Sequence, residues 1–149
     1  MKKILSAALT VLIFSQCNKL RCDCIAIEPF VLNQPFTMLF GNDYKETQTG
    51  KPLQLTMNQI ISDSRCPSDA VCVWEGRVEV TLILQQDGET RQDTMSLPGL
   101  IDPAFPVQDT SFFQGYSIIL QAVSPYPTST NAGSIPQNMY QLKMLVQKN

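Results

Sequence analysis

Two short stretches of the chain bring together side chains of the types that carry chemistry. Residues 63–67 are Asp-Ser-Arg-Cys-Pro, and residues 72–76 are Cys-Val-Trp-Glu-Gly. Cys66 and Cys72 flank a turn-forming segment that can bring their sulfur atoms together, so we expect a disulfide between them. Closing so short a loop stabilises a folded protein by about 2 kcal/mol.

The side chains beside this disulfide support two interpretations. In the first, which we favour, they are architectural: Trp74 packs on a buried cystine, and Asp63 and Arg65 pair at a turn. In the second they form an exposed rim that binds a polar ligand such as a sugar, with the indole as a stacking surface. The candidate ligand-binding residues are then Asp63, Arg65, Trp74 and Glu75.

Catalysis has little support in the residue types present. The chain contains no histidine, which removes the commonest general base and every Ser-His or Cys-His nucleophile. A carboxylate pair drawn from Asp63, Asp69 and Glu75 could in principle hydrolyse glycosides, but carboxylates in an exposed turn are usually only solvated. We therefore expect no catalytic residues and a protein that is not an enzyme.

Metal ions, cofactors and nucleic acids are not expected as ligands. Cys22 and Cys24 form a C-x-C pair and Cys66 and Cys72 a C-x5-C pair, and neither spacing is typical of zinc sites. The redox state of Cys22 and Cys24 stays open. The formal net charge is −2, and removal of Lys2 and Lys3 with a signal peptide would make it about −4. No basic stripe is present that could neutralise phosphates.

The motif DSRCP-x4-C-x-W-x-G, which spans residues 63–76, resembles the signature of a family of small exported bacterial proteins, many of them lipoproteins. The function of that family is uncharacterised. The resemblance extends weakly through the preceding leucine-rich strand and a later strand that begins at Tyr116. It implies a shared fold and a location in the cell envelope, and it implies no activity.

The N-terminus carries the pattern of a bacterial lipoprotein. Lys2 and Lys3 precede an apolar run over residues 4–14, which is too short to span a bilayer as a helix. Ser15-Gln16-Cys17 resembles a lipobox, which predicts a signal peptide over residues 1–16 and acylation of Cys17; an ordinary cleaved secretory signal is the alternative. The basic residues that follow favour an outer-membrane anchor facing the periplasm over the cell surface.

The remaining chain has the period of two that is typical of β-strands. We predict a tether over residues 17–34 and one antiparallel β-sandwich over residues 35–149, with an open barrel as the alternative. Asp87-Gly88 predicts a two-residue hairpin turn that places Val78 opposite Leu97 and Val80 opposite Met95. The pattern also breaks at Ile60-Ile61, which indicates a bulge.

The function that these features favour is an envelope-anchored, non-catalytic binding module. It would hold the membrane through its lipid and a protein or glycan partner through its loops. An alternative is a periplasmic inhibitor or envelope-assembly factor that acts through the Pro-rich segments 98–115 and 124–138. Exposed rings at Phe112, Phe113 and Tyr126 would favour that alternative, and buried rings would count against it.

Overall fold

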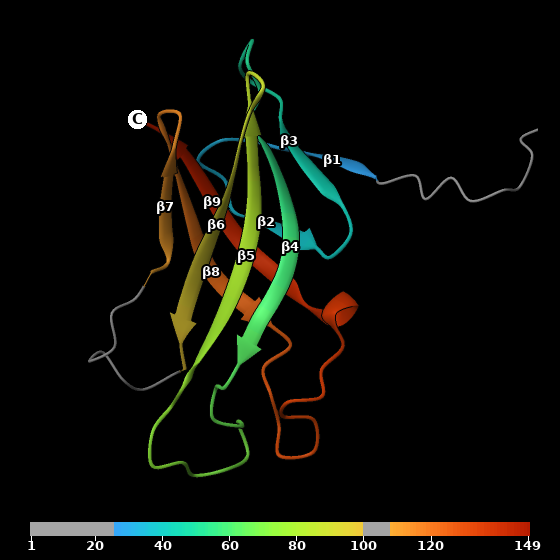
Figure 1. The fold of residues 1–149 in the computed structure, drawn as a ribbon, viewed down its shortest axis with the longest axis vertical. Helices are drawn as coiled ribbons and strands as arrows, with labels where there is room; N and C mark the ends of the chain where they lie inside the picture. Colours follow the sequence, from blue (N-terminus) through green and yellow to red (C-terminus); the bar gives the residue numbers. More distant parts are fainter. Residues whose placement is uncertain (1–25, 100–107) are drawn as a thin grey trace, which may run out of the picture.

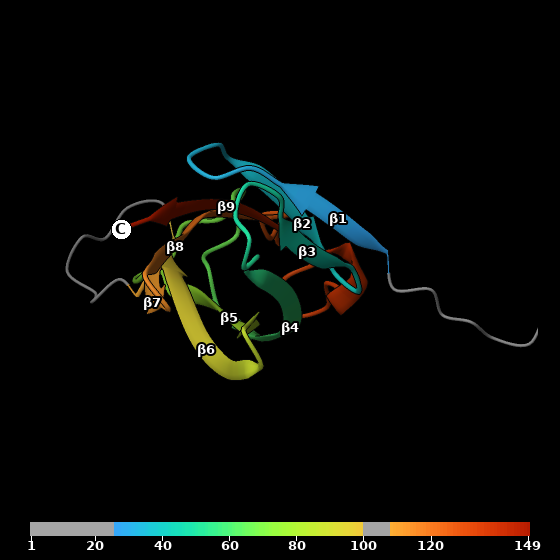
Figure 2. The same cartoon turned by 90° about the horizontal axis from the view of Figure 1, so that it is seen from above.

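The chain folds into two β-sheets that pack face to face, in a computed structural model that describes residues 26–99 and 108–149 (Figures 1 and 2). One sheet has the order β1-β3-β4-β5-β6, and the other has the order β2-β9-β8-β7. Neither sheet closes on itself, so the predicted β-sandwich is confirmed over the open barrel. The strands of the first sheet are β1 (Ile27–Phe30), β3 (Asp43–Glu46), β4 (Gln54–Asp63), β5 (Arg77–Gln86) and β6 (Glu89–Pro98). Those of the second are β2 (Phe36–Leu39), β9 (Gln141–Lys148), β8 (Tyr116–Ser124) and β7 (Thr110–Phe113), with a short 3-10 turn η1 (Gln137–Met139) before β9.

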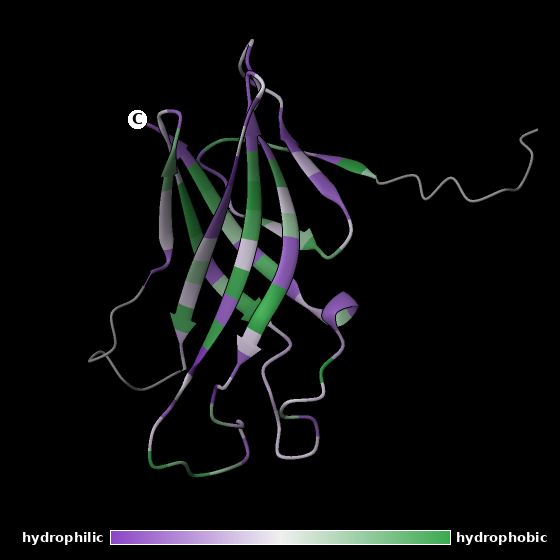
Figure 3. Ribbon diagram, viewed as in Figure 1, coloured by the Kyte–Doolittle hydropathy of each residue, from purple (hydrophilic) through white to green (hydrophobic). Residues whose placement is uncertain are grey.

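The core lies between the sheets and is filled by alternate residues of the long strands, as the bands of hydropathy along β5 show (Figure 3). The β5–β6 hairpin has the predicted register, with Val78 opposite Leu97 and Val80 opposite Met95. Because side chains alternate between the two faces of a strand, this register points one face of each strand inward. The long strands contribute these buried side chains: Leu55, Met57, Ile60, Val78, Val80, Leu82, Leu84, Met95, Ile118, Leu120, Val123, Leu142, Met144 and Val146.

The sandwich begins earlier in the chain than the predicted tether over residues 17–34 allows. β1 pairs with β3 in parallel, from Ile27 opposite Asp43 to Phe30 opposite Glu46. Phe30 is buried, and its ring stacks on that of Phe36 with 4.5 Å between centroids. β1 has four residues and includes a proline, so its alternation is too short to be recognised in the sequence. The predicted signal peptide, Cys17, Cys22 and Cys24 lie outside the described residues.

Bulges set which residues of β4 and β8 reach the core. The predicted bulge in β4 is confirmed, since its register with β5 shifts between Met57 and Gln59 and again between Ile60 and Ser62. A shift in β8 after Leu120 buries Val123 and leaves Ala122 exposed. Strict alternation along β8 would place Ala122 on the inner face with Leu120, and the extra residue of a bulge explains the difference.

The segments that connect β4 to β5 and β8 to β9 lie side by side at one end of the sandwich, the lower end in Figure 1. We call residues 64–76, which connect β4 to β5, the disulfide loop. A backbone hydrogen bond of 2.9 Å from Ser68 N to Pro127 O joins it to the second connection. Within the described residues, the structure contains no helix with the length and apolarity needed to cross a membrane.

Candidate functional site

The base of the disulfide loop continues the pairing of β4 with β5. Ser64 N donates to the carbonyl oxygen of Arg77 at 2.9 Å, and Cys66 N donates to that of Glu75 at 2.8 Å. The predicted disulfide between Cys66 and Cys72 is confirmed, with 5.9 Å between the two Cα atoms. The loop is therefore closed at its base by the backbone and again, further out, by a covalent bond.

Gly76 is required where the two arms of the loop meet. Its φ is +62°, in the left-handed region, and a Cβ atom built on it would lie 1.9 Å from the carbonyl oxygen of Ser64. No side chain can occupy that position unless the backbone moves. Glycine thus allows the close approach that the hydrogen bonds across the base need.

Asp63 and Arg65 form a buried ion pair and not an exposed ligand-binding rim. Arg65 is only 5% exposed. Its Nε and Nη2 atoms donate to the two carboxylate oxygens of Asp63 at 2.8 and 2.6 Å, in a bidentate arrangement. The burial of both side chains contradicts the second interpretation, in which they face solvent as part of an exposed rim, while the favoured architectural interpretation of the pair agrees with the structure.

The ion pair connects the two sheets. From Arg65, Nη1 donates to the carbonyl oxygen of Val123 at 2.7 Å, and Nη2 donates to that of Pro125 at 3.0 Å. The hydroxyl of Tyr140 donates to Asp63 Oδ2 at 3.0 Å. Asp63 ends β4 in one sheet, whereas Val123 belongs to β8 in the other sheet and Tyr140 immediately precedes β9. The guanidinium also lies 4.6 Å from the ring centroid of Tyr126.

Titration of Tyr140 reflects this environment. Burial, which disfavours the phenolate, and the adjacent negative charge of Asp63 together raise the pKa of Tyr140 to about 12. The tyrosine therefore stays neutral and keeps donating its proton to Asp63 over the physiological range of pH.

A second connection holds the outer part of the disulfide loop. Ser129 donates to Asp69 through both its backbone N and its hydroxyl, each at 2.6 Å. These hydrogen bonds lower the pKa of the Asp69 carboxyl below its usual value. Asp69 thus turns toward the connection between β8 and β9, and its negative charge is satisfied there.

The outermost residues of the disulfide loop are apolar and exposed. Trp74 is 73% exposed, and Val71 and Val73 are almost completely exposed. We call residues 70–74 the apolar tip. The prediction that Trp74 packs on a buried cystine is wrong, because the disulfide lies beyond the ends of β4 and β5 and not between the sheets.

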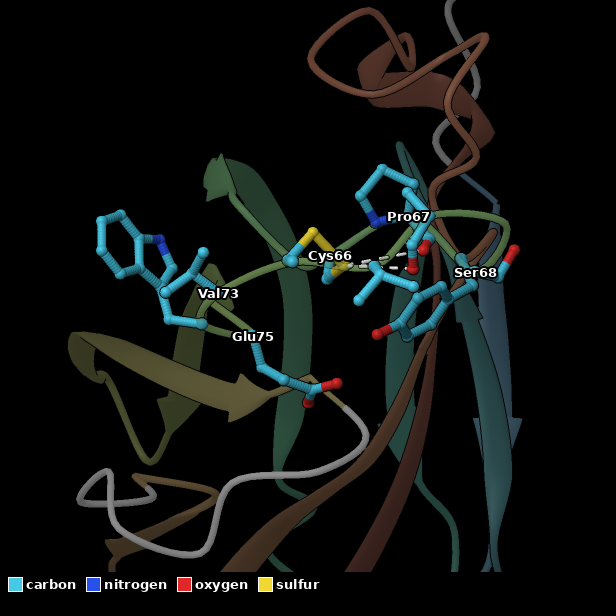
Figure 4. Close-up of a pocket in the computed structure, with 10 residues that line it drawn as sticks. Cys66, Pro67, Ser68, Val73 and Glu75 are labelled. Atoms are coloured by element: carbon cyan, nitrogen blue, oxygen red, sulfur yellow. Dashed lines mark hydrogen bonds between the residues drawn. A yellow bond between two sulfur atoms is a disulfide. The ribbon is translucent and has the colours of Figure 1, made fainter.

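A hollow of about 370 Å³ lies between the apolar tip and the connection from β8 to β9. Figure 4 shows Val73 and Glu75 on one side of Cys66, with Pro67 and Ser68 on the other. The walls are mainly apolar and include the disulfide, while Glu75 and Ser68 contribute polar atoms. The full lining is Cys66, Pro67, Ser68, Ala70, Val71, Cys72, Val73, Trp74, Glu75 and Tyr126.

The arrangement offers binding surface more than reactive groups. Of the three carboxylates considered for glycoside hydrolysis, Asp63 is held by Arg65 and Tyr140, and Asp69 is held by Ser129. Across residues 26–99 and 108–149, no group of three or more His, Cys, Asp or Glu side chains could hold a metal ion. Trp74 and Glu75, the other two candidate residues, both line the hollow.

Val71 and Val73 are the site residues that the sequence analysis did not single out. The available signal for their exposure was their position on either side of Cys72, in a segment too short to cross a sheet. Comparison with known proteins adds no family to this description: no family model, no curated protein and no solved structure matches the chain.

Proposed function

We propose that this protein is a non-catalytic binding module anchored in the bacterial cell envelope, and that it binds through the apolar tip and the adjacent hollow. One observation carries the proposal. A loop that contributes no side chain of its tip to the core is held at its base, at its disulfide and at Asp69, and it presents Trp74 to the solvent.

A fixed loop with an exposed apolar tip is suited to binding for three physical reasons. Burial of a valine or larger apolar side chain contributes about 1.5–3 kcal/mol, and the tip forgoes that contribution at three neighbouring positions. The loop is also ordered before any partner arrives, which lowers the entropy lost on binding. Tryptophan is the residue type most often found at the energetic centre of interfaces. Exposed Trp74 on a fixed loop fits such a centre.

Acylation at Cys17 places the module in the envelope under this proposal, with the outer membrane facing the periplasm as the favoured location. Intact-mass analysis of the protein from the membrane fraction should find a diacyl or triacyl glyceryl group on Cys17. A soluble protein with an unmodified N-terminus at another residue would contradict the anchor and would leave the binding surface to be tested separately.

A periplasmic inhibitor or assembly factor is the second candidate, and the aromatic residues support it only in part. Phe112 is exposed on the edge strand β7, but Phe113 is buried, and Tyr126 is half-buried beneath the guanidinium of Arg65. Much of the 124–138 segment supports the disulfide loop through Pro127 and Ser129. It is therefore less available as an independent recognition loop.

Site-specific photo-crosslinking tests the binding surface. A photoreactive phenylalanine derivative replaces Trp74 in the full chain in bacterial cells, and the same derivative replaces Phe112 as the matched control, because both side chains are exposed. We expect an adduct from position 74 and none from position 112. Absence of any adduct at 74, whether to protein, glycan or lipid, with the thermal midpoint of the variant unchanged, would refute the proposal.

A further inference from the structure

We infer that the apolar tip inserts into the interfacial region of a lipid bilayer, so that the domain lies against the membrane that carries its anchor. This inference rests on the proposed function and names the surface that the tip binds. Three observations support it: the shape and composition of the tip, the position of the nearby charges, and the direction from which the chain enters β1.

The tip is suited to a soft apolar phase. Val71, Val73 and Trp74 project so far that Val73 is 96% exposed and Trp74 is 73% exposed. The segment from Ala70 to Trp74 contains no charged residue. Tryptophan prefers the interface between hydrocarbon and water, because its ring is apolar and its N–H group needs a polar partner.

Charges near the tip are directed away from it. Asp69 accepts hydrogen bonds from Ser129, on the connection between β8 and β9. Glu75 lies over Gly99, where an added Cβ would be 2.7 Å from the carboxylate Oε2. The only basic residue of the disulfide loop, Arg65, is buried. Insertion should therefore depend on apolar contact and should not require anionic lipids.

The direction in which the chain enters β1 allows the anchor and the tip to approach the same membrane. β1 is parallel to β3, and β3 is antiparallel to β4, so β1 runs away from the end of the sheet where the disulfide loop lies, although it pairs beside the start of β4. Ile27 pairs with Asp43, and Asp43 pairs with Thr56, so Ile27 is level with Thr56 in the sheet. Thr56 lies seven residues before Asp63, which is about 23 Å along a strand. Residues 17–25 span at most about 30 Å when extended. An extended tether can therefore carry Cys17 past the level of Asp63, in the direction of the tip, and a bilayer that holds its acyl group can lie against that end of the domain.

A bilayer accounts for the tip better than a protein pocket does. A pocket would have to enclose three side chains that are each more than 70% exposed, whereas the interfacial region surrounds them without a matching shape. Insertion of three side chains is weak by itself, but the anchor holds the tip close to the membrane and converts a weak contact into a stable orientation.

The test uses Trp74 as its own reporter, because it is the only tryptophan of the chain. The protein begins at residue 17 and carries Cys17→Ser, so that neither an apolar signal segment nor an acyl chain can bind lipid. Phosphatidylcholine vesicles in the millimolar range should shift the emission of Trp74 to the blue, and lipids brominated near the headgroup end of their chains should quench it. Vesicles that also contain phosphatidylglycerol should give no stronger binding.

Matched variants separate insertion from general adhesion. Val71→Ser combined with Val73→Ser retains the reporter and should lower the partition coefficient about tenfold or more, because two aliphatic side chains no longer leave water. Phe112→Ser removes an exposed aromatic ring on β7 and should leave the partition coefficient unchanged. Both variants should unfold at the temperature of the parent, since none of these side chains is buried.

Two outcomes would overturn the inference: no spectral shift at any lipid concentration, or a shift that the paired valine substitutions do not weaken. Either result together with a protein adduct from position 74 in cells would leave the proposed binding module standing with a protein as its partner. Absence of both lipid binding and any adduct would refute the proposed function as well.

Discussion

Replacement of Arg65 by methionine should be among the most destabilising single changes in the domain. The side chains of Arg65 and Asp63 are 3% and 6% exposed. Arg65→Met keeps a similar apolar length but leaves the carboxylate of Asp63 buried without its counter-ion. It also removes the donors from the carbonyl oxygens of Val123 and Pro125.

The expected loss follows from these contacts. Removal of one partner of a buried ion pair costs about 3–5 kcal/mol, because the remaining charge stays in a poorly solvating environment. Each buried acceptor left without a donor costs about 1–3 kcal/mol more, and the effects of groups in one network do not add fully. We therefore expect a loss of about 4 kcal/mol or more in the free energy of unfolding, out of a total of roughly 5–15 kcal/mol.

Urea denaturation followed by far-UV circular dichroism measures this loss. With a slope of about 1.5 kcal/mol/M, the midpoint should fall by roughly 2.5 M. The matched control is Lys51→Met, which breaks an ion pair with Asp87 whose side chains are 74% and 47% exposed, and it should leave the urea midpoint nearly unchanged. A loss below about 1 kcal/mol for Arg65→Met, with an unchanged slope, would refute the structural role assigned to the pair.

Three further predictions concern the same end of the sandwich. Gly76→Ala should destabilise the domain by at least about 3 kcal/mol in urea denaturation, whereas Gly88→Ala should cost only about 1–2 kcal/mol. Both glycines have positive φ, but of the two only Gly76 has an atom within 4 Å of an added Cβ. Equal losses would contradict the steric argument. Cys66→Ala with Cys72→Ala should lower the free energy of unfolding by about 2 kcal/mol, and free thiols at both positions in protein from the envelope would contradict this prediction. The pKa of Tyr140 is raised from 10.0 to about 12, so its contribution to the free energy of unfolding is complete below pH 10 and is lost as the pH rises toward 12. The variant Tyr140→Phe should therefore lack this component of the alkaline denaturation curve.

Much of the sandwich could be predicted because its information is local. Asp87 and Gly88 form the turn of the β5–β6 hairpin, and a two-residue turn fixes every later pair in the hairpin. The alternation along β9, and along β4 as far as its first bulge, likewise identifies the inner face without reference to the rest of the chain. Strands of four residues, such as β1 and β7, carry too few repeats of the period to be recognised.

The positions of the site residues could not be predicted, because they depend on segments far along the chain. Arg65 is buried by carbonyl oxygens that lie 58 and 60 residues later. Trp74 is exposed because the core was already filled by the long strands and the disulfide lies beyond their ends. The favoured architectural interpretation therefore agrees with the structure for the charged pair, whereas it is wrong for Trp74, which the tertiary contacts leave exposed.

The motif of residues 63–76 divides into groups that build the loop and one that the loop displays. Asp63 and Arg65 tie the loop to the second sheet, the disulfide closes it, and Gly76 lets its two arms meet. Trp74 has no comparable contact with the core, and its exposure costs stability. Since several supports act on one short loop and its large apolar residue stays in solvent, the contact that buries Trp74 is expected outside the chain.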